Sequence, residues 1–87
     1  MNNVFLSEQR HQYLRSLFPE LTSKQFQYLF YFSLGLTSEK ISCLLGCSKK
    51  TVINQVNTIR SKLSLESTSD LRIVFLVRVI TPSDYHF

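Results

Sequence analysis

Hydrophobic residues recur at helical spacing along this chain and predict a series of short helices. Between residues 49 and 63 four apolar side chains fall at offsets of 0, 4, 7 and 11, which places them on one stripe of an α-helix. They are Val52, Val56, Ile59 and Leu63. The opposite side offers hydrogen-bonding residues and no acid: Lys50, Asn54, Asn57, Thr58 and Ser61, flanked by Thr51 and Gln55. The pattern therefore predicts a helix with one buried stripe and a polar outer face.

An aromatic helix is predicted from about residue 23 to residue 33. It begins with the signature of a capping box, in which Thr22 and Gln25 satisfy each other's backbone amides, and Gly35 suits a left-handed C-terminal cap. Its apolar residues surround the axis: Phe26, Leu29 and Phe30 on one side, Tyr28, Tyr31 and Phe32 on the other. Such a helix must be covered on two sides. We expect this cluster to be mainly core, with a dimer or partner surface as the alternative.

Two further helices are predicted towards the ends of the chain. The first is opened by Ser7 and stopped by Pro19, and it should bury Tyr13, Leu14, Leu17 and Phe18. The second follows a cap between residues 67 and 70 and covers residues 71–79. The β-branched residues of this segment favour a strand equally well. Apart from Arg72 and Arg78 this segment is apolar, so it should be buried on more than one side.

Residues 37–62 contain two helical patterns joined by a tight turn. The first, about residues 38–45, is capped by Thr37 or Ser38 and should bury three residues before it ends at Gly46: Ile41, Leu44 and Leu45. Ser48 then caps the helix of residues 49–63. A helix, a glycine-containing turn and a second helix with a polar outer face indicate a helix-turn-helix, whose second helix enters the major groove of DNA.

The net charge of the chain, +4, resides in the same segment. Residues 37–62 contain Glu39 as their single acid and five bases: Lys40, Lys49, Lys50, Arg60 and Lys62. Clustered bases that neutralise phosphates release condensed counterions, which supplies most of the non-specific affinity for DNA. Double-stranded DNA is therefore the predicted partner.

Other functions find little support in the composition. Eighty-seven residues suit one domain with a single small core. Cys43 and Cys47 have neither zinc-site nor redox-pair spacing, so we expect both to be small core residues. His11 and His86 lie apart from any other candidate catalytic residue in the sequence. We therefore expect no enzyme, no metal and no cofactor. The chain shows no secretory signal and no apolar run long enough to span a bilayer, so we expect a soluble cytoplasmic protein without a membrane partner.

Taken together, the residues that shape these elements resemble the LuxR-type (LuxR/NarL-like) DNA-binding domain over about residues 21–75. The resemblance rests on Leu21-Thr22, Leu29, Gly35, Ile41, Leu45-Gly46, Ser48, Thr51-Val52, Ile59 and Lys62-Leu63. It implies an all-α fold, a small helical bundle of four helices, here with an extra N-terminal helix. It also implies that residues 49–63 form the recognition helix and that the last helix often supplies a dimer contact.

The predicted DNA contacts come from both helices of the motif. They are Thr37, Ser38, Lys40, Ser48, Lys49, Lys50, Thr51, Asn54, Gln55, Thr58, Arg60 and Lys62. Amide and hydroxyl groups suit base edges, whereas cations and the amides at helix starts suit phosphates. The chain has Ile53 and Gln55 where the family usually has Lys and His, so no operator sequence follows from the resemblance. Ile53 would either touch a thymine methyl group or pack against a neighbour.

We therefore expect an N-terminal helical extension (residues 1–20), a DNA-binding domain (residues 21–80) and a C-terminal tail (residues 81–87). The predicted function is that of a stand-alone, sequence-specific transcriptional regulator that acts as a homodimer on paired half-sites. The alternative is a protein-interaction module that uses the helix-turn-helix scaffold to bind RNA polymerase or another regulator. The helix-turn-helix of the fourth region of sigma factors is a third, lower-ranked reading.

Overall fold

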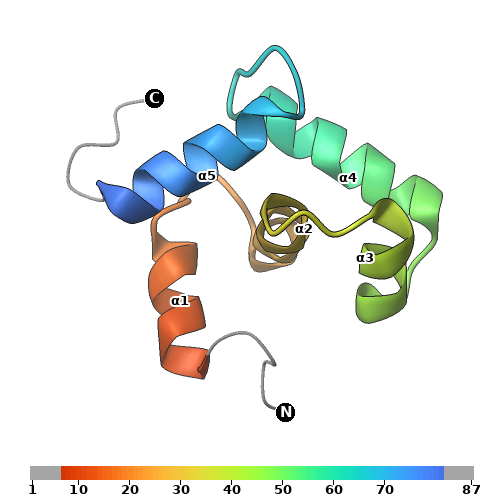
Figure 1. Ribbon diagram of the computed structural model, residues 1–87, viewed down its shortest axis with the longest axis horizontal. Helices are drawn as coiled ribbons and strands as arrows, with labels where there is room; N and C mark the ends of the chain where they lie inside the picture. The colour runs from red at the N-terminus through yellow and green to blue at the C-terminus, as the bar shows by residue number, and fades with distance from the viewer. Residues whose placement is uncertain (1–6, 82–87) are drawn as a thin grey trace.

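Five α-helices and no strand make up residues 7–81, the part of the chain that the computed structural model describes. They are α1 (Glu8–Ser16), α2 (Ser23–Ser33), α3 (Ser38–Leu45), α4 (Lys49–Lys62) and α5 (Asp70–Ile80). Helix α2 runs through the middle of the molecule, with α1 and α5 on one side and α3 and α4 on the other (Figure 1). The predicted all-α bundle is confirmed. Residues 1–6 of the predicted extension and residues 82–87 of the predicted tail lie outside the described residues.

The first four helices begin at residues that the sequence marks as caps. The side chains of Ser7, Thr22, Thr37 and Ser48 each accept a hydrogen bond from the amide three residues ahead. Each bond satisfies one of the amides that a helix leaves without an internal partner at its start. At α2 the Gln25 side chain also accepts from the Thr22 amide at 3.0 Å, which completes the predicted capping box. Helix α5 differs, because its N-cap residue, Ser69, lies in the predicted range but makes no capping bond with its side chain.

The core forms around α2, as its apolar pattern requires. Phe26, Leu29 and Phe30 are each at most 3% exposed, and Tyr28 on the other side of the helix is 3% exposed. The ring of His11 in α1 lies edge-on to Phe26 and Phe30, with ring centroids 5.2 and 5.5 Å apart. The expectation that the aromatic cluster is mainly core is confirmed.

Three residues predicted to be buried lie at the surface. Tyr13 is 45% exposed, Leu44 is 47% exposed, and Cys43 is exposed as well. These predictions are wrong because α1 and α3 are each covered on one narrow stripe, which contains Leu14 and Ile41. Neighbouring positions turn about 100° per residue away from such a stripe, so Cys43 projects from the opposite side of α3.

Residues 70–80 are helical, although their β-branched residues allow a strand. Their burial differs from the prediction. One face, with Leu71, Val74 and Arg78, is buried, whereas Ile73, Leu76 and Ile80 on the opposite face are 57–66% exposed. The expected burial of this segment on more than one side is therefore wrong, since among residues 7–81 the covered face of α5 is the one towards α2 and the α1–α2 connector.

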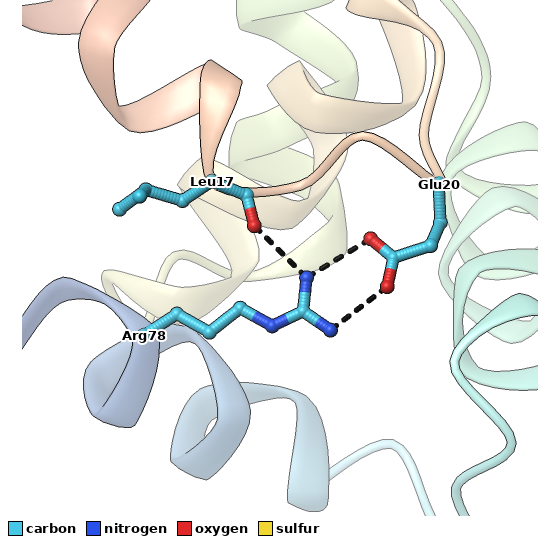
Figure 2. Close-up of polar contacts among 3 residues, drawn as sticks. All are labelled: Leu17, Glu20 and Arg78. Carbon is cyan, nitrogen blue, oxygen red and sulfur yellow. Dashed lines mark hydrogen bonds and ion pairs between the residues drawn. The ribbon is translucent and has the colours of Figure 1, made fainter. Parts of the chain in front are cut away.

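Arg78 is the buried charged residue of α5, with 2% of its surface exposed. Its guanidinium Nη1 donates to the Leu17 carbonyl and to Glu20 Oε1, and Nη2 donates to Glu20 Oε2, each at 2.9 Å (Figure 2). It also lies 4.8 Å from the centre of the Phe18 ring. The hydrogen bonds from Arg78 hold the pKa of the Glu20 carboxyl below its usual value. Arg78 therefore joins α5 to the connector between α1 and α2.

This ion pair generates the first prediction. Glu20→Gln removes the carboxylate and leaves the buried Arg78 guanidinium without its counter-charge. The free energy of unfolding should fall by about 1–2 kcal/mol, less than for a fully buried pair, because the Glu20 side chain is 37% exposed and solvent screens the charge. Urea denaturation at pH 7 measures the change. As a matched control, Glu66→Gln makes the same charge change at an exposed position and should alter stability by less than about 0.5 kcal/mol. Equal stabilities of the two variants would contradict the role assigned to Arg78.

Candidate nucleic-acid interface

Helices α3 and α4 form the predicted helix-turn-helix, and their mutual position is fixed by burial. Ile41 of α3 and Val52 and Ile59 of α4 have no exposed surface, and both helices pack on α2. The apolar stripe that the sequence predicts for α4 therefore faces inward, and Leu63 at its end is half-buried.

The turn between α3 and α4 is pinned to α2. Gly46 adopts the left-handed conformation with φ of 67°, and the Cys47 amide donates to the Ser42 carbonyl at 3.0 Å. The Sγ atom of Cys47 lies 3.5 Å from the Tyr28 hydroxyl. This contact and the burial of the ring raise the pKa of Tyr28 to about 12. Cys47 is half-buried, as a small core residue would be, in contrast to Cys43.

The outer face of α4 is open to solvent. Lys50, Ile53, Asn54, Asn57, Thr58 and Ser61 are all exposed, whereas Thr51 and Gln55 on its flank are half-buried. One acid, Glu39 of α3, pairs with the start of α4, where its carboxylate lies 3.7 Å from Lys49 Nζ. Both partners of that pair are more than half exposed, so it contributes at most about 1 kcal/mol.

Several polar groups of this face are already engaged by the helix itself. Asn57 Nδ2 donates to the Ile53 carbonyl at 3.0 Å, and Thr58 Oγ1 donates to the Asn54 carbonyl at 3.0 Å. The Ser48 hydroxyl lies 2.9 Å from the Thr51 hydroxyl. By contrast, Asn54 and Gln55 make no side-chain hydrogen bond with any described residue. Their amides keep both donor and acceptor for an outside partner.

The five bases of residues 37–62 divide into two groups. Lys49 and Lys50 stand at the start of α4, and Lys40 is exposed on α3. At the other end, Arg60 Nη1 donates to the Leu65 carbonyl at 2.8 Å. Lys62 Nζ donates to Gln25 Oε1 at 2.9 Å and to the Glu20 carbonyl at 3.4 Å.

These bonds give Arg60 and Lys62 a structural role that the sequence does not indicate. Arg60 fastens the loop after α4, and Lys62 links the last turn of α4 to the capping box of α2. The acceptors are neutral amide and carbonyl oxygens, so the positive charge of both residues persists at the surface. A phosphate contact by Arg60 or Lys62 stays a prediction.

The starts of α3 and α4 have their capping side chains in use. The Thr37 hydroxyl accepts from the Lys40 amide at 3.2 Å, and the Ser48 hydroxyl accepts from the Thr51 amide at 3.1 Å. Ser38, the first residue of α3, is half-buried. The remaining amides of these two helix starts carry the positive end of the helix dipole, which favours anions.

Two other kinds of feature, a metal-ligand cluster and a membrane-spanning helix, are absent from residues 7–81. No three His, Cys, Asp or Glu side chains gather there in an arrangement that could hold a metal ion. Within the same residues, each helix is too short or too polar to cross a membrane.

The comparison with known families places this geometry in context. The family model GerE, described as bacterial regulatory proteins of the luxR family, matches residues 19–75, which is more than half of the chain. The match contains α2, α3, α4 and the first half of α5, and it leaves out α1 and Arg78. No curated protein and no solved structure matches the chain.

The cap of α4 provides a prediction about this site. Ser48→Ala removes the bond to the Thr51 amide and should lower the free energy of unfolding by about 1 kcal/mol. Thermal unfolding followed by circular dichroism measures the loss. Ser61→Ala changes the same residue type on the exposed face of α4, where alanine favours the helix, and should raise stability by about 0.5 kcal/mol or less. A loss of the same size in both variants would show that the cap contributes nothing specific.

Proposed function

Since the chain belongs to the luxR family of bacterial regulatory proteins, we propose that it regulates transcription by inserting α4 into the major groove of DNA. The observation that carries the proposal is the outer face of α4, which is exposed, free of acids and flanked by lysines. We place this activity in the cytoplasm, where bacterial DNA resides.

The dimensions and chemistry of α4 suit this task. A helix of 14 residues is about 21 Å long, and the major groove, about 12 Å wide, admits one α-helix. Asn54 and Gln55 have free amides that match the paired donors and acceptors of base edges. They are the proposed base readers, together with Thr51 and Thr58.

Phosphate contacts are proposed for the margins of the same surface. Lys40, Lys49 and Lys50 supply charge on one side, and Arg60 and Lys62 supply charge at the far end of α4. The amides at the starts of α3 and α4, beside Thr37, Ser38 and Ser48, supply uncharged donors. Such contacts fix the orientation of the domain on the duplex, whereas the base readers select the sequence.

We further propose that the protein acts as a homodimer through α5. Ile73, Leu76 and Ile80 form an apolar stripe on the face of α5 that points away from the core. A symmetric dimer uses the same patch on both copies, and burial of this stripe would remove three large apolar side chains from water. Two copies would then contact two half-sites, which compensates for the limited surface that one small domain buries on DNA.

The α5 stripe would also suit a second function, that of a protein-interaction module. An interaction module that binds RNA polymerase or another regulator was expected to use an exposed aromatic surface, but the α2 aromatic cluster is largely buried. The exposed apolar stripe of α5 is the surface that such a module would use.

DNA binding should depend steeply on salt. If about four phosphates are neutralised per subunit, log K should fall against log salt with a slope of about −3 to −4. Replacement of Lys49 and Lys50 by Gln should reduce the magnitude of the slope by about 2. Fluorescence anisotropy with a labelled duplex measures these values. Arg10→Gln removes one charge on α1, across α2 from the α3–α4 side (Figure 1), and should leave the slope unchanged. No binding at low salt, or no effect of the lysines, would favour the interaction module.

The dimer proposal has a separate test. Sedimentation velocity at micromolar concentration, with and without DNA, should show two copies associated. Leu76→Lys should prevent the association, because it places a charge in the centre of the apolar stripe. Leu34→Lys makes the same change at a residue of similar exposure outside the stripe and should leave the dimer intact. A wild-type protein that is monomeric in both conditions excludes the homodimer.

A further inference from the structure

An isoleucine interrupts the polar outer face of α4. Ile53 is 43% exposed and lies three residues after Lys50 and four before Asn57, so the three side chains share one side of the helix. Asn54 follows directly. One exposed isoleucine is ordinary on a protein surface, but this one lies midway along the helix between residues that face the groove in the proposed complex.

The chemistry of the neighbouring groups narrows what Ile53 can contact. Its own carbonyl accepts the Asn57 side-chain amide at 3.0 Å, which uses one of the two Nδ2 protons of Asn57 within the helix. Asn54 has no side-chain hydrogen bond with any described residue. The centre of the face therefore presents an aliphatic group beside a free carboxamide.

The major groove offers a complementary pair of groups on A·T base pairs. Thymine carries a methyl group at C5, and among the four standard bases it alone presents an apolar group in the major groove. Adenine presents N6 and N7, which can pair with a carboxamide. We infer that Ile53 is a specificity-determining residue that packs against a thymine methyl group, with Asn54 reading an adenine close by. This inference rests on the proposed function and deepens it, because it names the base class that α4 selects.

Uracil tests the inference directly, because it pairs as thymine does and lacks the methyl group. The full chain selects duplexes from a random-sequence pool, and the selected duplex is then synthesised with uracil in place of each thymine in turn. At one thymine per half-site the affinity should fall about fourfold, the value of one buried methyl group. Anisotropy titration at constant salt provides the comparison.

Three variants assign the loss to Ile53. Ile53→Ala should bind the thymine and uracil duplexes equally, whereas Leu34→Ala, an exposed leucine at the end of α2, should retain the fourfold difference. A third variant, Ile53→Lys, should shift the selected base at that position towards guanine, whose O6 and N7 accept hydrogen bonds from lysine. The exposure of Ile53 means that neither change disturbs the core.

The outcomes separate this inference from the proposed function. Salt-dependent binding to a selected duplex, with no loss on uracil substitution or with a difference that survives in Ile53→Ala, overturns the inference and leaves the proposed function standing. A selected half-site without thymine overturns it equally. Absence of any duplex binding overturns both.

Discussion

The arrangement of the whole domain follows from one constraint, the need to cover α2 on two sides. Phe26, Leu29 and Phe30 are buried on one side of this helix and Tyr28 on the other, so no single neighbouring layer can shield it. The chain supplies α1 and α5 to one side and the α3–α4 pair to the other (Figure 1). Because the apolar stripe of α4 packs against α2, the opposite face of α4 points into solvent. The polar surface on which the proposed function depends is thus a consequence of core packing.

Local sequence signals account for the helices and for much of the candidate interface. A capping bond joins residues three apart, and the apolar stripe of α4 repeats within one helix. Both can therefore be predicted from the sequence without tertiary information. The hydrogen bonds of Lys62 cannot be predicted in this way, because its partners Gln25 and Glu20 lie 37 and 42 residues away in the chain. Burial of short helices is also poorly predicted: the pattern of α1 and α3 shows which residues are apolar, and only the packed bundle shows how narrow the covered stripe is.

The most polar and the most apolar exposed faces lie on different helices. Apart from Ile53, the outer face of α4 carries lysines, amides and hydroxyls, whereas the outer face of α5 carries Ile73, Leu76 and Ile80. Lys62 and Glu20 connect the two regions, since Glu20 accepts from Lys62 through its carbonyl and from Arg78 through its carboxylate. One connector residue thus contacts both the helix of the proposed DNA surface and the helix of the proposed dimer surface.

The position of Arg78 also bears on how the domain can be isolated or transplanted. The segment that matches the family model, residues 19–75, excludes Arg78 and also Leu17 and Phe18, which its guanidinium contacts. A fragment trimmed to the matched segment would uncover Phe26 and Phe75, which pack on the ring of Phe18, and would leave Glu20 without its counter-ion. A unit fit for grafting onto another protein therefore extends at least from Leu17 to the end of α5.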